Sequence, residues 1–138
     1  DASSFIFEDN FRSAALIEHA QYKLMASEKR QMDALVVATS DPALATVAFG
    51  DAKVWFDAGR LDLKQYRSSL DKADEIAKAE RVLTLLSQNE AVRTQVAAAA
   101  AAGDWTLAVD LNKGRNDNPG VDHLTAETDT ILPELSDG

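Results

Sequence analysis

The sequence predicts an all-α fold, an up-and-down bundle of the four-helix type with a long first helix followed by short, broken helices. Apolar residues recur at helical spacing along most of the 138 residues, and only 6 glycines and 3 prolines interrupt them. No pair of alternating strands and no βαβ succession is apparent. At this length we expect one domain, residues 1–138, that buries a single core.

The first helix is predicted over residues 5–39, a length of about 50 Å at the usual rise per residue. Its apolar sector is predicted to be buried and contains Phe7, Ala14, Ile17, Ala20, Leu24, Met25, Met32 and Leu35. Arg12, His19, Lys23 and Arg30 follow one another at spacings of 7, 4 and 7 residues, so they project from one side of this helix. We call these four residues the basic stripe and expect it opposite the core.

Capping signals divide the next segment into two predicted helices. Ser40 or Asp41 caps a helix that has Pro42 in its first turn and ends at Gly59. Its buried side is predicted to comprise Leu44, Val47, Ala48 and Trp55. After a short hairpin, Asp62 and Gln65 form a capping box, so the following helix is expected from residue 63.

The remaining third of the chain is also predicted to be helical. Residues 87–90, Ser-Gln-Asn-Glu, repeat the capping-box pattern and favour a break, with a new helix from residue 88 through six consecutive alanines. Gly103 ends that helix and Asp104 caps a short one. Residues 112–120 are expected to form a loop, and Asn118 or Asp122 to cap a last helix that ends near Pro133.

Composition excludes several classes of function. A net charge of -9 argues against a nucleic-acid partner, and the absence of cysteine excludes thiol nucleophiles, disulfides and cysteine-bound metals. No run of 18 apolar residues and no leader pattern is present, so we expect neither a membrane span nor a signal peptide. Phosphate loops, zinc-protease motifs and nucleophile elbows are absent, and residues 110–121 lack the glycine and glutamate of a calcium loop. We therefore predict no enzyme activity, no catalytic residues, no metal site and no cofactor.

The basic stripe provides the candidate ligand-binding residues Arg12, His19, Lys23 and Arg30, with Tyr22 at its flank. Guanidinium and imidazole groups can hold a carboxylate or similar anion, and a second copy of the first helix could complete such a pocket in a homodimer. The alternative interpretation is a solvated face with no ligand. A haem-binding bundle, with Met32 and His123 as axial ligands, is a third hypothesis.

The layout and several short motifs resemble the extracytoplasmic helical-bundle sensor domains of bacterial histidine kinases and chemoreceptors. These motifs are Ser-Asp-Pro-Ala-Leu at 40–44, Ser-Gln-Asn-Glu-Ala-Val-Arg at 87–93 and Ala-Ala-Gly-Asp-Trp at 101–105. The resemblance implies a periplasmic domain held between two membrane helices of an inner-membrane receptor. It also implies dimerisation through the first helix and binding of a small molecule or a periplasmic protein, with Arg12 and Arg30 at places where such receptors grip anions. The alternative is a soluble helical interaction protein without a small ligand.

Overall fold

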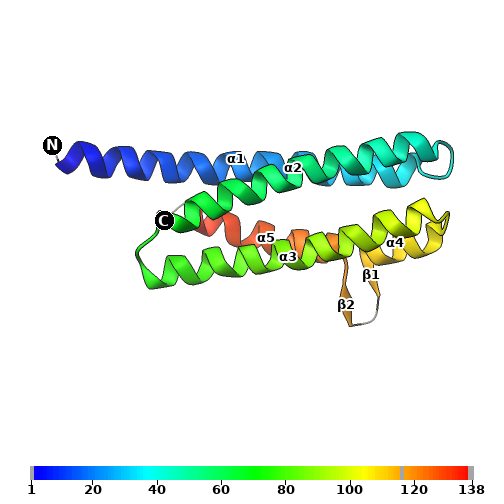
Figure 1. The fold of residues 1–138 in the computed structure, drawn as a ribbon. Helices are drawn as coiled ribbons and strands as arrows, with labels where there is room; N and C mark the ends of the chain where they lie inside the picture. The colour runs from blue at the N-terminus through cyan, green and yellow to red at the C-terminus, as the bar shows by residue number, and fades with distance from the viewer. Residues whose placement is uncertain (1, 116, 137–138) are drawn as a thin grey trace.

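The computed structural model describes residues 2–115 and 117–136, with side chains for 13–114 and 117–135. It contains the helices α1 (Ala2–Val37), α2 (Pro42–Ser68), α3 (Ala73–Ala101), α4 (Trp105–Lys113) and α5 (Val121–Ser136). The chain runs up and down, and α4 and α5 together form the fourth column beside α3 (Figure 1). The start of α1 and the end of α5 lie at the same end of the bundle (Figure 1). The predicted all-α bundle is confirmed.

The helix α2 is continuous where the sequence predicts a stop and a new start. Of the two predicted caps, Ser40 and Asp41, it is Asp41 that caps α2, because its side chain accepts a hydrogen bond from the Leu44 N–H at 3.0 Å. The predicted break at Gly59 is wrong, since this glycine lies in the contact with α1, where an added Cβ would sit 3.0 Å from Leu24 Cγ. Asp62 does not cap a helix either, because its carboxylate lies 2.8 Å from Lys23 Nζ of α1.

The predicted break at residue 88 is also wrong, since α3 runs without interruption from Ala73 to Ala101. The polar residues of the capping-box sequence make tertiary contacts instead: Asn89 is buried and Glu90 pairs with Arg60 of α2. The predicted end of α3 and start of α4 are confirmed. Gly103 takes a left-handed φ of 78° after α3, and the Asp104 side chain accepts from the Leu107 N–H at 3.1 Å to cap α4.

The connection from α4 to α5, predicted as a loop, contains a short antiparallel ladder of β1 (Gly114–Arg115) and β2 (Asn118–Pro119). This pair is an exception to the prediction that the chain forms no strands. Gly114 has a φ of 104°, and a Cβ on Gly120 would lie 2.3 Å from the Gly114 nitrogen. The base of the hairpin therefore needs glycine at both positions.

The ends of α5 differ from the predicted ones. The carbonyl of Gly120 accepts from the Leu124 N–H at 3.1 Å, so Gly120 occupies the N-cap position in place of Asn118 or Asp122. The helix also continues through Pro133 to Ser136. Leu132 and Leu135 are buried on either side of this proline, and their burial favours a continuous helix there.

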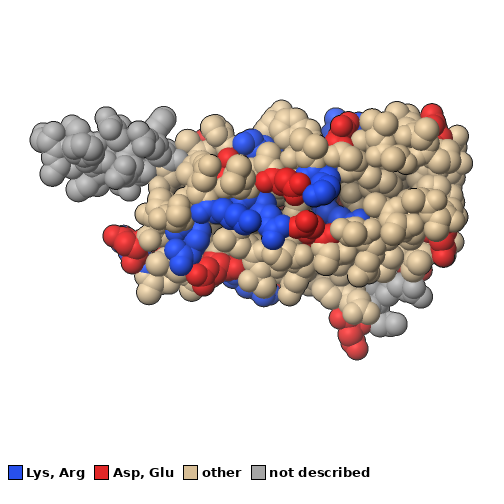
Figure 2. Space-filling model, viewed as in Figure 1, with Lys and Arg blue, Asp and Glu red and all other residues tan. Residues whose placement is uncertain are grey.

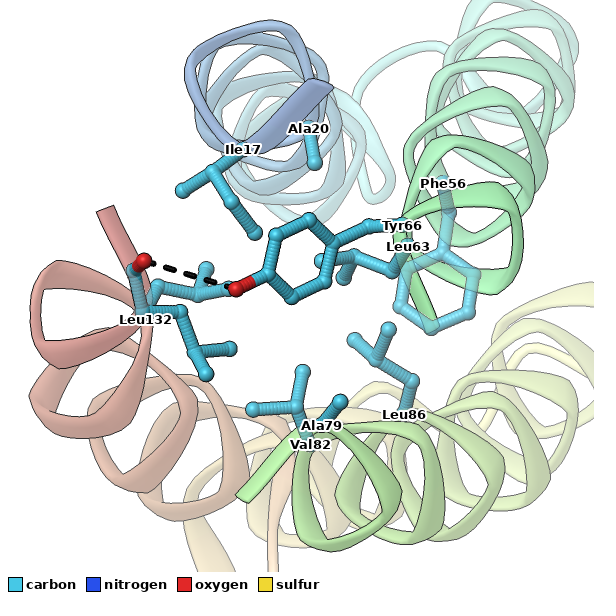
Figure 3. Packing of buried hydrophobic residues seen from close by; sticks show 10 residues of the cluster. Ile17, Ala20, Phe56, Leu63, Tyr66, Ala79, Val82, Leu86 and Leu132 are labelled. Atoms are coloured by element: carbon cyan, nitrogen blue, oxygen red, sulfur yellow. Dashed lines mark hydrogen bonds between the residues drawn. The ribbon is translucent and has the colours of Figure 1, made fainter. Parts of the chain in front are cut away.

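One cluster of buried side chains lies between the four columns near the end of the bundle where α1 begins (Figure 3). Every column contributes to it, and the Tyr66 hydroxyl donates to the Leu135 carbonyl at 3.4 Å. The cluster comprises Ile17, Ala20, Phe56, Leu63, Tyr66, Ala79, Val82, Leu86, Leu132 and Leu135. This cluster fixes the relative positions of α1, α2, α3 and α5.

Small residues line the contact between α1 and α2, which is the most extensive between any two helices. The buried small residues are Ala20, Ser27 and Ala34 on α1, Ala38 in the turn after it, and Ala45, Ala48, Ala52 and Gly59 on α2. Small side chains at these positions let the two helix axes approach closely. The predicted burial of Met25, Met32, Leu44 and Val47 is wrong, because these four side chains lie on the solvent side of the contact: Met25 is 71% and Met32 47% exposed. Phe7 lies outside the described side chains.

The bundle thus consists of two hairpins, α1 with α2 and α3 with α4 and α5. Contacts between the hairpins are sparser than contacts within them, and α1 touches α5 less than α2 touches α3. Space between the hairpins is therefore where cavities are expected.

Candidate functional site

Arg93 of α3 lies in the middle of the bundle with its guanidinium held by three hydrogen bonds. Nε donates to Asn89 Oδ1 at 2.8 Å, one terminal nitrogen donates to Ser27 Oγ at 2.8 Å, and the other donates to Glu28 Oε2 at 3.1 Å. The guanidinium carbon also lies 4.8 Å from the centroid of the Phe56 ring, a cation–π distance. Arg93 therefore contacts α1, α2 and its own helix.

Thr125 connects this arginine network to α5. Its hydroxyl donates to Glu28 Oε2 at 3.3 Å and accepts from Asn89 Nδ2 at 3.2 Å. The Ser27 hydroxyl in turn donates to the carbonyl of Ala52 at 2.6 Å. We call Ser27, Glu28, Asn89, Arg93 and Thr125 the Arg93 layer. The side chains of this layer connect α1, α3 and α5, and the Ala52 carbonyl extends the polar network to α2.

A cavity of about 380 Å³ opens beside the Arg93 layer, between α1, α3 and α5. The volume falls within the range of small-molecule sites. Phe56 of α2 and Arg93 form part of its wall. The remaining lining residues are Gln21, Leu24, Met25, Glu28, Leu86, Asn89, Thr125, Thr128 and Asp129. The cavity therefore combines an apolar surface with hydroxyl, amide and charged groups.

Burial alters the charged groups of this cavity. Desolvation raises the pKa of Glu28, and neighbouring Asp122 and Asp129 raise it further, against the opposing effects of Arg93 and the Thr125 hydrogen bond. Desolvation also raises the pKa of Asp129 and lowers the pKa of Arg93. In the described part of the chain no cation pairs with Asp129. The cavity thus holds one cation and two carboxylates.

A second cavity, of about 270 Å³, lies on the α2–α3 side of the bundle. It shares Phe56 and Arg93 with the first cavity, so these two side chains separate the two spaces. Lys and Arg side chains alternate with Asp and Glu on this face of the molecule (Figure 2). Lys53 and Asp57, which both line this cavity, pair at 2.9 Å, and its Glu90 pairs with Arg60 of α2. These charged groups of the cavity wall are therefore paired within the chain.

Lys23 and Arg30 of the basic stripe lie at the boundary between α1 and α2 and not opposite the core as expected. Lys23 Nζ is 2.8 Å from Asp62, and Arg30 is 2.8 Å from Asp51 and 3.4 Å from Asp33. Two of its cations are therefore already paired with carboxylates.

The other predicted ligand-binding residues do not form a pocket with these two cations in the described part of the chain. His19 is exposed, and the side chain of Arg12 lies outside the described residues. Tyr22 is 66% exposed and meets the ring of Trp55 edge-on at a centroid distance of 5.9 Å.

The sequence interpretation missed the Arg93 layer, although the sequence contains a signal for it. Ser27 and Gln31 continue the spacing of Ala20 and Leu24 on α1, and Asn89 and Arg93 follow Leu86 at the same spacing on α3. Polar residues at core positions of two facing helices indicate a buried network.

The structure does not support the haem hypothesis. Met32 is exposed, and His123 Nε2 lies 2.8 Å from Glu127 Oε1 at the surface of α5. Over residues 2–115 and 117–136, no group of three His, Asp or Glu side chains is placed to hold a metal ion.

No helix in these ranges is both long and apolar enough to cross a membrane. No protein-family model matches the chain, and neither a curated protein nor a solved structure matches it at a significant level.

Proposed function

We propose that the chain is the ligand-binding sensor domain of a bacterial transmembrane receptor, and that its ligand occupies the cavity beside the Arg93 layer. The observation that carries this proposal is the position of that cavity. Most of its wall comes from α1, α3 and α5, and the hairpins touch less between α1 and α5 than between α2 and α3. A molecule bound there touches both hairpins at once.

Such a ligand could signal by moving one hairpin relative to the other. Binding that favours one arrangement of the hairpins shifts the population toward it, and helix shifts of about 1–2 Å are a common form of this change. Helices α1 and α5, which both line the cavity, approach the same end of the bundle (Figure 1). A relative displacement of these helices would therefore reach any segments joined to that end.

The remaining parts of the proposal come from the resemblance to sensor domains. They are a periplasmic location between two membrane helices, a small molecule or periplasmic protein as partner, and a homodimer formed through α1. The exposed apolar residues Tyr22, Met25, Met32 and Val36 on α1 support the last of these. The proposal predicts apolar segments of about 20 residues on both sides of the bundle in the full-length protein, and their absence there would overturn the receptor assignment.

A thermal-shift screen with organic acids, amino acids and small amines tests the ligand site. A ligand at 100 times its dissociation constant raises the free energy of unfolding by about 2.7 kcal/mol. We expect Arg93→Lys, which keeps the charge but loses the planar set of guanidinium N–H donors, to reduce the thermal shift caused by a compound that binds. We expect the same of Thr125→Val. The control Arg30→Lys alters the basic stripe and should leave the response unchanged.

The outcomes of this screen separate the sites. A response lost in Arg30→Lys but retained in Thr125→Val would place the ligand on the basic stripe. No response from any compound would contradict the small-molecule part of the proposal. Far-ultraviolet circular dichroism of each variant confirms that it is folded before its response is compared.

A second candidate function is a helical interaction protein without a small ligand. The observation in its favour is the exposed apolar side chains on α2, which are Leu44, Val47, Val54 and Leu61. Together with exposed Tyr22 of α1 they offer apolar surface on the first hairpin. This candidate predicts no hit in the screen and self-association by sedimentation that Val54→Glu abolishes.

A further inference from the structure

We infer that the cavity beside the Arg93 layer takes a small organic cation, a protonated amine with an apolar body. This inference rests on the proposed function, because it names the ligand class of the same cavity. It departs from the anion that the basic stripe suggests. The argument depends on which charges in the cavity are already satisfied and which are open to a ligand.

The positive charge of the cavity is already satisfied. Arg93 donates to acceptors on Asn89, Ser27 and Glu28 and lies against the ring of Phe56. An anion that bound the guanidinium in place of Glu28 would leave this carboxylate without its cation. Removing one member of a buried ion pair is strongly unfavourable, and Asp122 and Asp129 of α5 add repulsion here.

The negative charge of the cavity is open to a ligand. Both hydrogen bonds to Glu28, from Arg93 and Thr125, go to Oε2, and the described residues provide none to Oε1. Oε1 of Glu28 is not enclosed. Asp129 carries a second carboxylate on the cavity wall, and no described residue forms an ion pair with it. An ammonium group has three N–H donors, which two carboxylates and a hydroxyl can satisfy.

The rest of the lining fits the apolar body of such a ligand. Leu24 and Met25 of α1, Leu86 of α3 and Phe56 of α2 supply apolar surface beside the carboxylates. Burial of aliphatic or aromatic carbons against these side chains adds affinity in proportion to the area removed from water. A primary amine on a compact hydrocarbon therefore matches the polar and the apolar parts of the cavity.

The pH dependence of binding has opposite signs for the two ligand classes. The charged groups that face Glu28 are Arg93 from α3 and Asp122 and Asp129 from α5, whereas Phe56 of α2 carries no charge. An ammonium binds ionised Glu28 and Asp129, so its affinity falls as these carboxylates are protonated at lower pH. An anion at Arg93 would instead bind more tightly at lower pH, because protonation of Glu28 frees the guanidinium.

The test compares benzylammonium, phenylacetate and benzyl alcohol, three probes of similar size with charges of opposite sign or none. Dissociation constants are measured by nuclear magnetic resonance titration at pH 7.5 and pH 5, following the methyl signals of Met25 and Leu86. We expect benzylammonium to bind at least tenfold more tightly than the other two at pH 7.5, and more weakly at pH 5. A charge-assisted hydrogen bond supports a difference of about this size.

Asp129→Asn is the decisive variant, because it removes one carboxylate from the exposed side of the cavity. We expect it to weaken benzylammonium binding about tenfold and to leave benzyl alcohol binding unchanged. Glu134→Gln is the matched control on α5, since Glu134 pairs with Lys78 outside the cavity, and it should not alter binding.

Three results would overturn the inference. Tighter binding of phenylacetate, strengthened at pH 5, would assign the cavity to anions and leave the proposed sensor function intact. Equal binding of the amine and the alcohol would show that the carboxylates do not contribute. No binding of benzylammonium to the parent protein would also contradict the ligand class, whereas the proposed function stands or falls on the separate screen and its Thr125→Val variant.

Discussion

Two glycines within α2 have the same helical backbone but different surroundings. Gly50 is exposed, and an added Cβ would meet nothing within 4 Å. Gly59 faces α1, where an added Cβ would lie 3.0 Å from Leu24 Cγ and 3.4 Å from the carbonyl oxygen of Ala20. Alanine has a higher helix propensity than glycine at both positions. A difference between the stability effects of the two glycine-to-alanine substitutions therefore reports the packing between α1 and α2.

We expect Gly50→Ala to raise the free energy of unfolding by about 0.5–1 kcal/mol, because it removes conformational freedom from the unfolded chain. Gly59→Ala should lower it by about 1 kcal/mol, because crowding against Leu24 outweighs the gain in propensity. Urea denaturation followed by circular dichroism measures both values. Equal stabilisation by the two variants would show that α1 and α2 are not closely packed at Gly59.

Residue-level predictions from the sequence succeed at the observed helix ends, where local signals and tertiary packing agree. Asp41, Gly103 and Asp104 perform the capping and stop roles that their neighbours in sequence predict. Arg93 was missed because its role depends on Glu28 and Thr125, which lie 65 and 32 positions away in the chain. Periodicity identifies core positions, but it does not show which polar residues on different helices meet.

At the scale of the helix, the α1–α2 contact depends on small side chains. Ala52 is almost fully buried there, and its carbonyl accepts the hydrogen bond of the Ser27 hydroxyl. Ala43, in the first turn of the same helix, is exposed. A larger residue at Ala52 must therefore separate the helices, whereas one at Ala43 extends into water.

We expect Ala52→Leu to lower the free energy of unfolding by about 1–3 kcal/mol through overpacking. Ala43→Leu should change it by less than about 0.5 kcal/mol, since both residues favour helices and the site is exposed. Chemical denaturation of both variants under one set of conditions makes the comparison. A neutral Ala52→Leu would mean that the two helices have room between them.

Helix boundaries were predicted less well than the helices themselves. The sequence places the first helix at 5–39, close to the observed Ala2–Val37, and predicts the helical state of most later residues. It divides α2 and α3 wrongly, because Asp62, Asn89 and Glu90 have the residue types of helix starts but serve contacts with other helices. The helix expected from residue 63 is instead interrupted at 69–72, between Ser68 of α2 and Ala73 of α3. Capping signals are local, whereas the decision to continue a helix depends on tertiary packing.

For the whole molecule, a net charge of -9 makes the protonation of carboxylates important for stability. Glu28 and Asp129 both have a pKa raised by burial. A carboxylic acid with a higher pKa in the folded state binds more protons when folded, so the free energy of unfolding rises as pH falls through the interval between the two values. That interval begins at the ordinary pKa values, 4.5 for Glu28 and 3.8 for Asp129, and extends upward.

Asp129→Asn should therefore be more stable than the parent protein at pH 7.5, by about 1 kcal/mol or less because the carboxylate is partly exposed. The difference should shrink as the pH falls toward the ordinary pKa of 3.8 and disappear below about pH 3, where the parent carboxylate is protonated in both states. Thermal unfolding from about pH 3 to pH 7.5 measures it, with Glu134→Gln as the control. A difference between Asp129→Asn and the parent that is independent of pH would rule out this electrostatic origin.

The two-hairpin arrangement gives a direct test of ligand-induced movement. The chain has no cysteine, so Glu18→Cys with Thr130→Cys introduces two spin labels, on exposed positions of α1 and α5. We expect ligand to change their mean separation by about 1–2 Å in pulsed electron resonance measurements. The control pair Glu18→Cys with Gln65→Cys spans α1 and α2 within one hairpin and should not change.

Phe56 and Arg93 lie between the two cavities, so a ligand in one cavity affects the space available in the other. Both side chains belong to the walls of both spaces, so a molecule that pushes them away from one space narrows the other. We therefore expect occupancy of the two cavities to be negatively cooperative. By thermodynamic linkage, each occupant weakens the binding of the other by the same factor.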